Sequence, residues 1–455
     1  MTGRWWCAHA WTGATVEHDV LVTVDDGRFT RVEPGTPRPP DVPALRGLVV
    51  PGLANAHSHA FHRLLRARTQ AGRGSFWTWR DLMYAAAARL DPDTYRELAT
   101  AVYAEMALAG VTGVGEFHYL HHDRDGARYA DPNATGLALA DAAGAAGIRL
   151  TLLDTCYLSS DVDGSPLGPA QLRFGDGSGE EWASRVGELY RTLSGVDGVL
   201  VGAALHSVRA VPLDHVPAVT GWAAAHDAPL HVHVAEQVAE VRRCREVHGA
   251  SPVELLHDAG ALGPRTTAVH ATHLTGTDID TLRATGTGVC FCPTTERDLG
   301  DGIGPAPELL TEPGPFPPTP FSLGSDSHAV IDLFEEARAV ELNERLRSRR
   351  RGVVDAPTLL RCATADGHRA LGRPDAGAIA PGRRADLVAI DLETVRTAGG
   401  GATAGTPVFA ATAADVTDVV VDGRVVVRDG RHVTVPDVAR RLAAVTAELL
   451  DGELV

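Results

Sequence analysis

Between residues 51 and 376, short apolar runs alternate with alanine-rich stretches of helical periodicity such as "TYRELATAVYAEMALAG". Short apolar runs predict buried strands, and the stretches between them predict helices. The runs are "LVVPGLANAHSH", "GVTGVGEFHY", "IRLTLLDTCY", "VLVGAALHSVRAV", "PLHVHVAE", "TTAVHATHL", "GTGVCFCPTT" and "PFSLGSDSHA". Eight parallel strands with intervening helices predict a (β/α)8 barrel of the TIM-like α/β class.

The two ends of the chain have a different pattern, in which apolar and polar residues alternate around turn dipeptides. Asp26-Gly27 lies within "VLVTVDDGRFTRVEPG", and Asp422-Gly423 joins two valine-rich runs. Asp-Gly between alternating runs is typical of a β-hairpin. We therefore expect residues 1–50 and 377–455 to form one small composite β-sandwich domain beside a barrel of residues 51–376.

Titratable residues gather at the ends of most of the apolar runs. The C-terminal strand ends are where barrels of this class place their active sites. His57 and His59 end the first run and project to one side, because alternate residues of a strand share a face. This pair alone is as consistent with a structural role as with metal binding. The fifth run adds His233, and the eighth adds Asp326.

Imidazoles and a carboxylate from separate strands are typical of zinc or iron sites that leave one position open for water. We assign His57, His59, His233 and Asp326 as ligands of one divalent metal, zinc, with Fe2+ as the alternative. His231 shares a face with His233 but lies deeper in the strand, which favours a packing role.

Three residues at the same strand ends are candidates for acid–base chemistry. Glu236 follows His233 by three positions, in the loop over the expected pocket. An isolated glutamate there is more often a surface residue, but hydrolysis of a C–N bond needs a group that carries a proton to the leaving nitrogen. His270 and Asp326 would orient the attacking water. His273 is expected to lie outside the site.

Composition and charge exclude several classes of function. The formal net charge of −16 argues against a nucleic-acid partner, which would need a basic patch. No apolar run approaches the roughly 20 residues of a membrane span. The N-terminal residues show no secretory signal, so a cytoplasmic location is expected. The six cysteines lack C-x-x-C spacing, and we expect them to be reduced.

The chain contains no lysine, so all 42 basic residues are arginine. Schiff-base chemistry, a phosphate-binding P-loop and a carbamylated lysine that bridges two metals are therefore excluded.

The motifs "PGLANAHSHA", "HVHVAE", "GSDSH" and "PGRRADLVAID" together resemble the amidohydrolase superfamily of metal-dependent deaminases and hydrolases. The resemblance covers nearly the whole chain and implies a metallo-barrel with a β-sandwich built from both termini. A chain without lysine cannot be a binuclear member with a carbamylated lysine, so the resemblance favours the mononuclear deaminase branch. Glu116 could hold a second metal, although an internal structural role is the favoured alternative.

The segment "GRGSFWTWRDLMY", with "EFHYLHH" and "LHSVRAV", is similar to a branch of this superfamily that hydrolyses a small linear amidine with two carboxylates. The resemblance implies that Arg80 and Arg209 bind these carboxylates, because guanidinium groups grip them in bidentate fashion. An ordinary ion pair is the alternative for Arg209. Tyr119, His206 and His62 are the implied polar contacts, although members of that branch often have glutamine in place of His62. The family also implies a homodimer.

Two other functions remain open. The same metal and acid–base residues could deaminate a heterocyclic base or nucleoside, such as cytosine, guanine or an adenosine derivative. The aromatic residues of "GRGSFWTWRDLMY" would then stack on the ring. A noncatalytic binding barrel is the second alternative. It is disfavoured because Glu236, His270 and Asp326 are all retained with the expected ligands.

Overall fold

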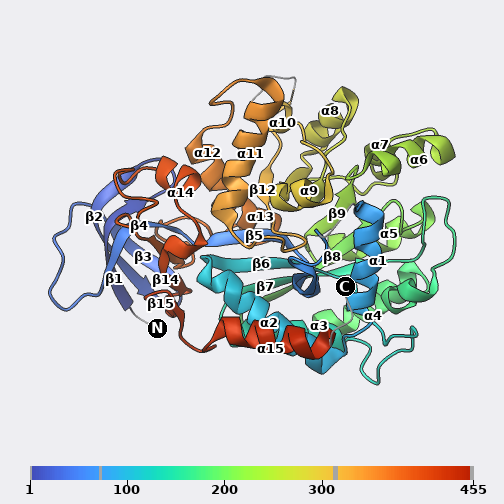
Figure 1. Ribbon diagram of the computed structural model, residues 1–455, viewed down its shortest axis with the longest axis horizontal. Helices are drawn as coiled ribbons and strands as arrows, with labels where there is room; N and C mark the ends of the chain where they lie inside the picture. Colours follow the sequence, from blue (N-terminus) through green and yellow to red (C-terminus); the bar gives the residue numbers. More distant parts are fainter. Residues whose placement is uncertain (1–2, 71–73, 311–315, 451–455) are drawn as a thin grey trace.

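The computed structural model describes residues 3–70, 74–310 and 316–450. Two sheets organise these residues: a barrel with its helices, at the right in Figure 1, and a β domain at the left. Residues 72 and 73 of the segment "GRGSFWTWRDLMY" lie outside the described residues.

The barrel sheet runs in sequence order, and each strand pairs in parallel with the next. Its strands are β5 (Leu53–Ser58), β6 (Val111–His118), β7 (Arg149–Cys156), β8 (Val199–Ser207), β9 (Leu230–Val234), β10 (Thr266–His270), β11 (Gly288–Phe291) and β12 (Phe321–Leu323). A parallel bridge between Ser58 and Asp326 brings the first and last strands together. This confirms the predicted α/β barrel.

Helices surround the barrel and cover its outer face (Figure 1). They are α1 (Phe76–Ala87), α2 (Pro92–Leu108), α3 (Ala134–Ala146), α4 (Gly179–Leu193), α5 (Val216–Ala225), α6 (Val238–His248), α7 (Pro252–Asp258), α8 (Gly276–Thr285), α9 (Pro293–Leu299), α10 (Ala306–Leu310), α11 (Leu333–Ser348), α12 (Ala356–Arg361), α13 (Gly367–Ala370), α14 (Gly405–Phe409) and α15 (Val438–Leu450). Short 3-10 turns are η1 (Ala60–Leu65), η2 (Pro169–Phe174), η3 (Leu213–His215) and η5 (Ala413–Asp415), and η4 (Cys362–Asp366) is a π-helical turn.

Local sequence explains where these helices begin. Asp91 caps α2 by accepting a hydrogen bond from the Thr94 amide, and Pro92 fills the first helical position. Asp332 caps α11 in the same way. These caps satisfy amide groups that a helix leaves without partners at its N-terminus.

Strands from both ends of the chain form the second sheet, which confirms that the small β domain is composite. It has the order β16-β15-β14-β13-β4-β1-β2-β3. The strands are β1 (Gly3–Trp11), β2 (Val16–Asp25), β3 (Arg28–Glu33), β4 (Ala44–Pro51), β13 (Leu387–Ile390), β14 (Val416–Val421), β15 (Arg424–Arg428) and β16 (Arg431–His432). An isolated bridge between Arg28 and Arg384 draws β3 towards β13, so the sheet folds over its own core.

The last helix leaves this β domain and packs on the barrel. In Figure 1, α15 lies beside α2 and α3, and its buried face includes Leu442, Val445 and Leu449. The C-terminal segment therefore connects the two parts of the molecule.

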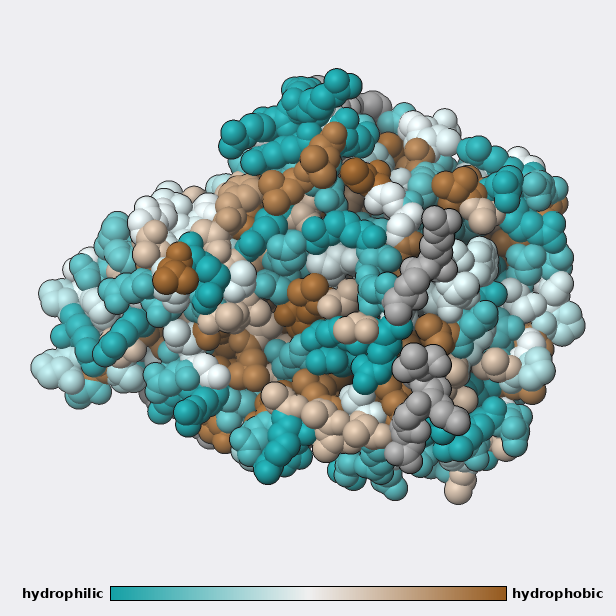
Figure 2. Space-filling model, viewed as in Figure 1, coloured by the Kyte–Doolittle hydropathy of each residue, from teal (hydrophilic) through white to brown (hydrophobic). Residues whose placement is uncertain are grey.

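Small apolar patches lie between hydrophilic residues on the face shown in Figure 2. Within the described residues, no helix combines the length and apolarity that crossing a membrane requires.

Candidate active site

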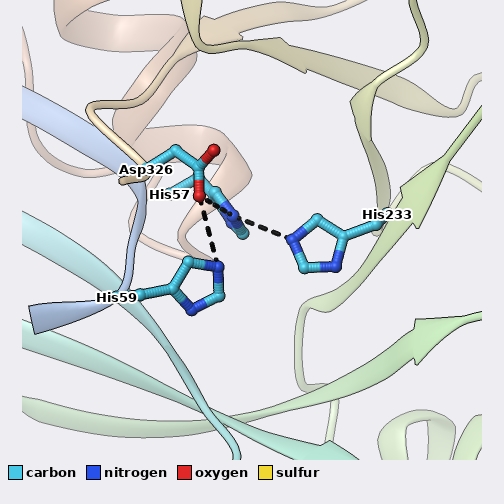
Figure 3. Close-up of side chains that lie close together, drawn as sticks. All are labelled: His57, His59, His233 and Asp326. Carbon is cyan, nitrogen blue, oxygen red and sulfur yellow. Dashed lines mark hydrogen bonds and ion pairs between the residues drawn. The ribbon is translucent and has the colours of Figure 1, made fainter. Parts of the chain in front are cut away.

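The four residues predicted to bind metal lie together at the C-terminal end of the barrel (Figure 3). His57 lies on β5 and His59 directly follows that strand; His233 comes from β9, and Asp326 from the turn after β12. Asp326 Oδ1 lies 3.4 Å from His57 Nε2 and 3.3 Å from His59 Nε2. His57 Nε2 lies 3.1 Å from His233 Nε2. All four side chains are buried.

Hydrogen bonds to the opposite ring nitrogens orient two of these histidines. His59 Nδ1 donates to the carbonyl of Phe117 at 2.8 Å, and His233 Nδ1 donates to the carbonyl of His206 at 2.8 Å. Since a carbonyl can only accept, Nδ1 carries the proton, and Nε2 of each ring keeps a lone pair directed at the cluster. This arrangement is typical of histidines that bind metals.

The pKa values of His57 and Asp326 also favour the binding of a metal cation. Burial lowers the pKa of His57 to about 3, which favours the neutral imidazole that metals bind. Burial alone would raise the pKa of Asp326, but contacts with His57 and His59 hold it well below its usual value. Three imidazoles and one carboxylate form a donor set that fits zinc or iron.

Glu236 and His270 face this cluster, as predicted. His270 Nε2 lies 3.8 Å from Glu236 Oε1 and 3.8 Å from Asp326 Oδ2. Burial alone would lower the pKa of His270, but the carboxylates of Glu236, Glu296 and Asp326 raise it well above the usual value. A group that exchanges protons therefore lies beside the proposed ligands.

A cavity with about 60 Å³ of free volume opens above these groups. Helix α1 forms one wall and contributes Arg80. The other lining side chains are mainly aromatic: Phe76, Trp79, Tyr84, Tyr119, Tyr157 and Phe174. The mixture of rings and a few polar groups suits a small ligand that is fixed by specific polar contacts.

The two arginines of the cavity differ in their partners. Arg209 Nη2 lies 3.3 Å from Glu236 Oε2, and its Nε lies 3.8 Å from Glu240 Oε2. Arg80 stacks on Trp77 with its guanidinium carbon 4.5 Å from the ring centroid. Among the described residues, Arg80 forms no ion pair, and its buried Nε lacks a hydrogen-bond partner. Arg80 is thus the cation that a bound anion can neutralise.

The other three predicted substrate contacts also line the cavity. His62 Nε2 lies 2.9 Å from the Tyr119 hydroxyl. The ring of His206 lies 4.4 Å from that of Tyr157 and borders the same space. Burial lowers the pKa values of His62 and His206 well below their usual range, which favours neutral rings that can both donate and accept.

Three residues that were weighed as alternatives lie in other environments. The Glu116 carboxylate accepts hydrogen bonds from Ser58 Oγ at 2.7 Å and the Ala60 amide at 2.6 Å, which favours a structural role, and burial raises its pKa to about 7. His231 Nε2 donates to the carbonyl of Ala370. His273 Nε2 donates to the carbonyl of Asp301.

A second buried group, His118, His121 and Asp154, also has the spacing of a metal site. Both oxygens of Asp154 already accept hydrogen bonds from the Arg185 guanidinium, at 2.9 and 2.7 Å. The charge of the carboxylate is therefore satisfied within the protein, and this group is a structural network.

Sequence reasoning missed two buried carboxylates of the site. Glu240 binds the Ala235 amide at 3.1 Å and lies beside Arg209. Glu296 lies 3.4 Å from His270 Nδ1. Their positions in the sequence were the available signal, since Glu240 follows Glu236 by four residues and Glu296 directly follows the seventh run.

A parallel barrel with this cluster and acid–base pair at its C-terminal strand ends is the framework of a metal-dependent hydrolase. Residues 48–426 match the model of the amidohydrolase family, and the chain belongs to this family. The resemblance seen in the sequence is therefore confirmed.

Individual relatives cover most of the chain. A formimidoylglutamate deiminase from Pseudomonas aeruginosa is 41% identical over 420 residues, which cover 90% of each chain. An 8-oxoguanine deaminase from the same organism is 32% identical and covers 83% of each chain. The crystal structure of an amidohydrolase from Brucella melitensis superposes with a TM-score of 0.90 at 34% identity, covering 98% of this chain and 100% of that one.

Proposed function

We propose that this protein hydrolyses N-formimidoyl-L-glutamate to N-formyl-L-glutamate and ammonia. The observation that carries the proposal is Arg80, a cation without a carboxylate partner among the described residues, in a cavity that also contains Arg209. A substrate with two carboxylates needs localised cations on a protein of net charge −16. The identity of 41% to a formimidoylglutamate deiminase supports the same substrate.

His57, His59, His233 and Asp326 would hold one divalent cation, and we propose zinc, with Fe2+ as the alternative. A divalent metal bound there would lower the pKa of a water molecule towards about 7 and so supply a nucleophile at neutral pH.

The protein's own residues would then move the protons. Asp326 and His270 orient the attacking water and accept its proton while oxygen bonds to the formimidoyl carbon. Glu236 carries the two water-derived protons in turn to the terminal nitrogen, whose bond to carbon breaks to release ammonia. Water supplies the oxygen and two hydrogens, so the products are balanced. The separations of 3.8 Å between His270 and both carboxylates support this assignment.

Arg80 and Arg209 would bind the two carboxylates, and Tyr119, His206 and His62 would make the remaining polar contacts. Arg209 also contacts Glu236 at 3.3 Å, so it would place the substrate next to the proton carrier. For this residue the predicted alternatives of substrate contact and ion pair are compatible, because its guanidinium has five donors.

The discriminating experiment measures ammonia release by the purified metal-loaded protein from N-formimidoyl-L-glutamate, cytosine, guanine, 8-oxoguanine and adenosine. We expect turnover of the linear amidine alone. Turnover of a base alone would refute the proposal and favour the heterocycle deaminase, which the 32% identity to an 8-oxoguanine deaminase keeps as the alternative. Binding of these compounds without turnover would favour the noncatalytic barrel.

Two further expectations accompany this function. We propose that the protein is a homodimer, as the family resemblance implies, and that it acts in the cytoplasm. Sedimentation of the purified protein tests the first, and fractionation of the source cells tests the second.

A further inference from the structure

Glu296 is a buried carboxylate beside the site that the proposed reaction does not use. It lies in the first turn of α9, and its Oε1 accepts a hydrogen bond from the Cys292 amide at 2.8 Å. The same oxygen lies 3.4 Å from His270 Nδ1. The side chain is 4% exposed, so water cannot replace these partners.

The two nitrogens of the His270 ring face different groups. Nε2 faces Glu236 and Asp326, each at 3.8 Å, where the reacting water would lie. Nδ1 faces Glu296. Glu296 Oε1 accepts a hydrogen bond from the Cys292 amide, and as a carboxylate oxygen it can accept a second one from His270 Nδ1. A hydrogen bond from Nδ1 to Glu296 leaves Nε2 as the nitrogen that faces the reacting water.

The backbone around His270 does not fix the ring by itself. His270 and Ala271 both have left-handed conformations, with φ of 68° and 48°. Such residues persist where surrounding contacts hold them. Glu296, in contrast, is anchored twice, through its carboxylate to the Cys292 amide and through its carbonyl to the Asp301 amide at 2.9 Å.

We infer that Glu296 is a positioning residue, which holds His270 with Nδ1 protonated and Nε2 directed at the reacting water. The inference rests on the proposed hydrolysis, since it assigns Glu296 a role in that reaction. The role is that of a carboxylate behind a catalytic histidine, and Glu296 itself need not touch the substrate.

The kinetic test compares Glu296→Ala with Glu296→Gln. In E296Q the amide oxygen must face the Cys292 amide, so the acceptor for Nδ1 is kept. We expect E296A to lower kcat by about 10- to 100-fold, the usual scale for groups that orient a functional histidine, with KM nearly unchanged. We expect E296Q to recover most of that loss.

Glu336, on α11, provides a matched control because it binds the same turn of α9. It is fully buried and accepts hydrogen bonds from the Thr294 amide and hydroxyl, but it lies outside the cavity. Glu336→Gln should therefore keep kcat and lower only the melting temperature. Equal kcat losses in E296A and E336Q at equal metal content would show that the turn is merely structural and would overturn the inference.

A measurement without substrate separates this inference from the proposed function. In protein labelled with 15N-histidine, the His270 Nδ1 proton should give a downfield resonance, assigned by its loss in His270→Asn. The resonance should disappear in E296A and persist in E296Q and E336Q. Persistence of the resonance in E296A would refute the inference, whatever the substrate of the wild type. Failure of the wild type to hydrolyse N-formimidoyl-L-glutamate would by itself refute only the proposed function.

Discussion

Replacement of Arg80 by methionine removes the cation of the cavity that lacks an ion-pair partner among the described residues. A hydrogen bond to a charged group contributes about 1.5–3 kcal/mol. Loss of the guanidinium should therefore lower kcat/KM by about 10- to 150-fold. We expect most of this loss in KM, because Arg80 lies on α1, and the acid–base groups lie at the strand ends.

The assay measures ammonia release for each combination of variant and substrate. Wild type and R80M are each given N-formimidoyl-L-glutamate and an analogue without the side-chain carboxylate, N-formimidoyl-2-aminobutyrate. If Arg80 binds that carboxylate, R80M should weaken only the reaction of the full substrate. Arg80→Lys should recover part of the loss, since a lysine keeps the charge but loses the bidentate geometry.

Arg89, exposed just beyond the end of α1, supplies the control for a general change of charge. Arg89→Met should leave both substrates unaffected. If R80M lowers kcat/KM equally for the full substrate and the analogue, Arg80 does not bind the side-chain carboxylate. If R80M changes neither, the assignment of Arg80 as a substrate contact is wrong.

The remaining predictions concern proton transfer, the metal and stability. Glu236→Gln should lower kcat at least about 10²-fold in steady-state assays while calorimetry still detects substrate binding; unchanged turnover would exclude the proton-carrier role. Removal of metal by a chelator should abolish ammonia release, and metal analysis should find one zinc or iron per chain after activity is restored; full activity of metal-free protein would contradict the assignment. Arg149→Met should lower the free energy of unfolding in urea by about 3–5 kcal/mol, because it leaves the buried Asp386 carboxylate without its guanidinium partner. A change below about 1 kcal/mol would show that Asp386 is satisfied by other groups.

The barrel could be predicted from the sequence because its signal is repeated. Each βα unit shows an apolar run followed by a helical stretch, so a wrong assignment in one unit does not affect the prediction of the others. The composite β domain was predictable for a related reason, since "VTDVVVDGRVVVRDG" shows the same alternation as the N-terminal strands. The helix α15 escaped this reasoning because its apolar face packs on α2, and that contact depends on the tertiary structure.

Residues that end strands were also predictable as members of the site, since parallel strands bring their C-terminal ends together. His57, His233 and Asp326 are far apart in the chain, but their ligand atoms lie within 4.8 Å of one another. Glu240 and Glu296 were not predictable in this way, because they lie on helices that follow the strands. On a helix, most glutamates are solvated, and only the packed structure shows that these two are buried.

Backbone conformation connects these two groups of residues. Ala235, His270 and Asp326 end or follow three strands, and each has a left-handed φ, of 51°, 68° and 42°. For a residue other than glycine this conformation costs of order 1 kcal/mol and needs support from its surroundings. Glu240 binds the Ala235 amide, and Glu296 lies against the His270 ring. The buried glutamates therefore hold the sharp turns by which the strand ends direct Glu236 and His270 into the cavity.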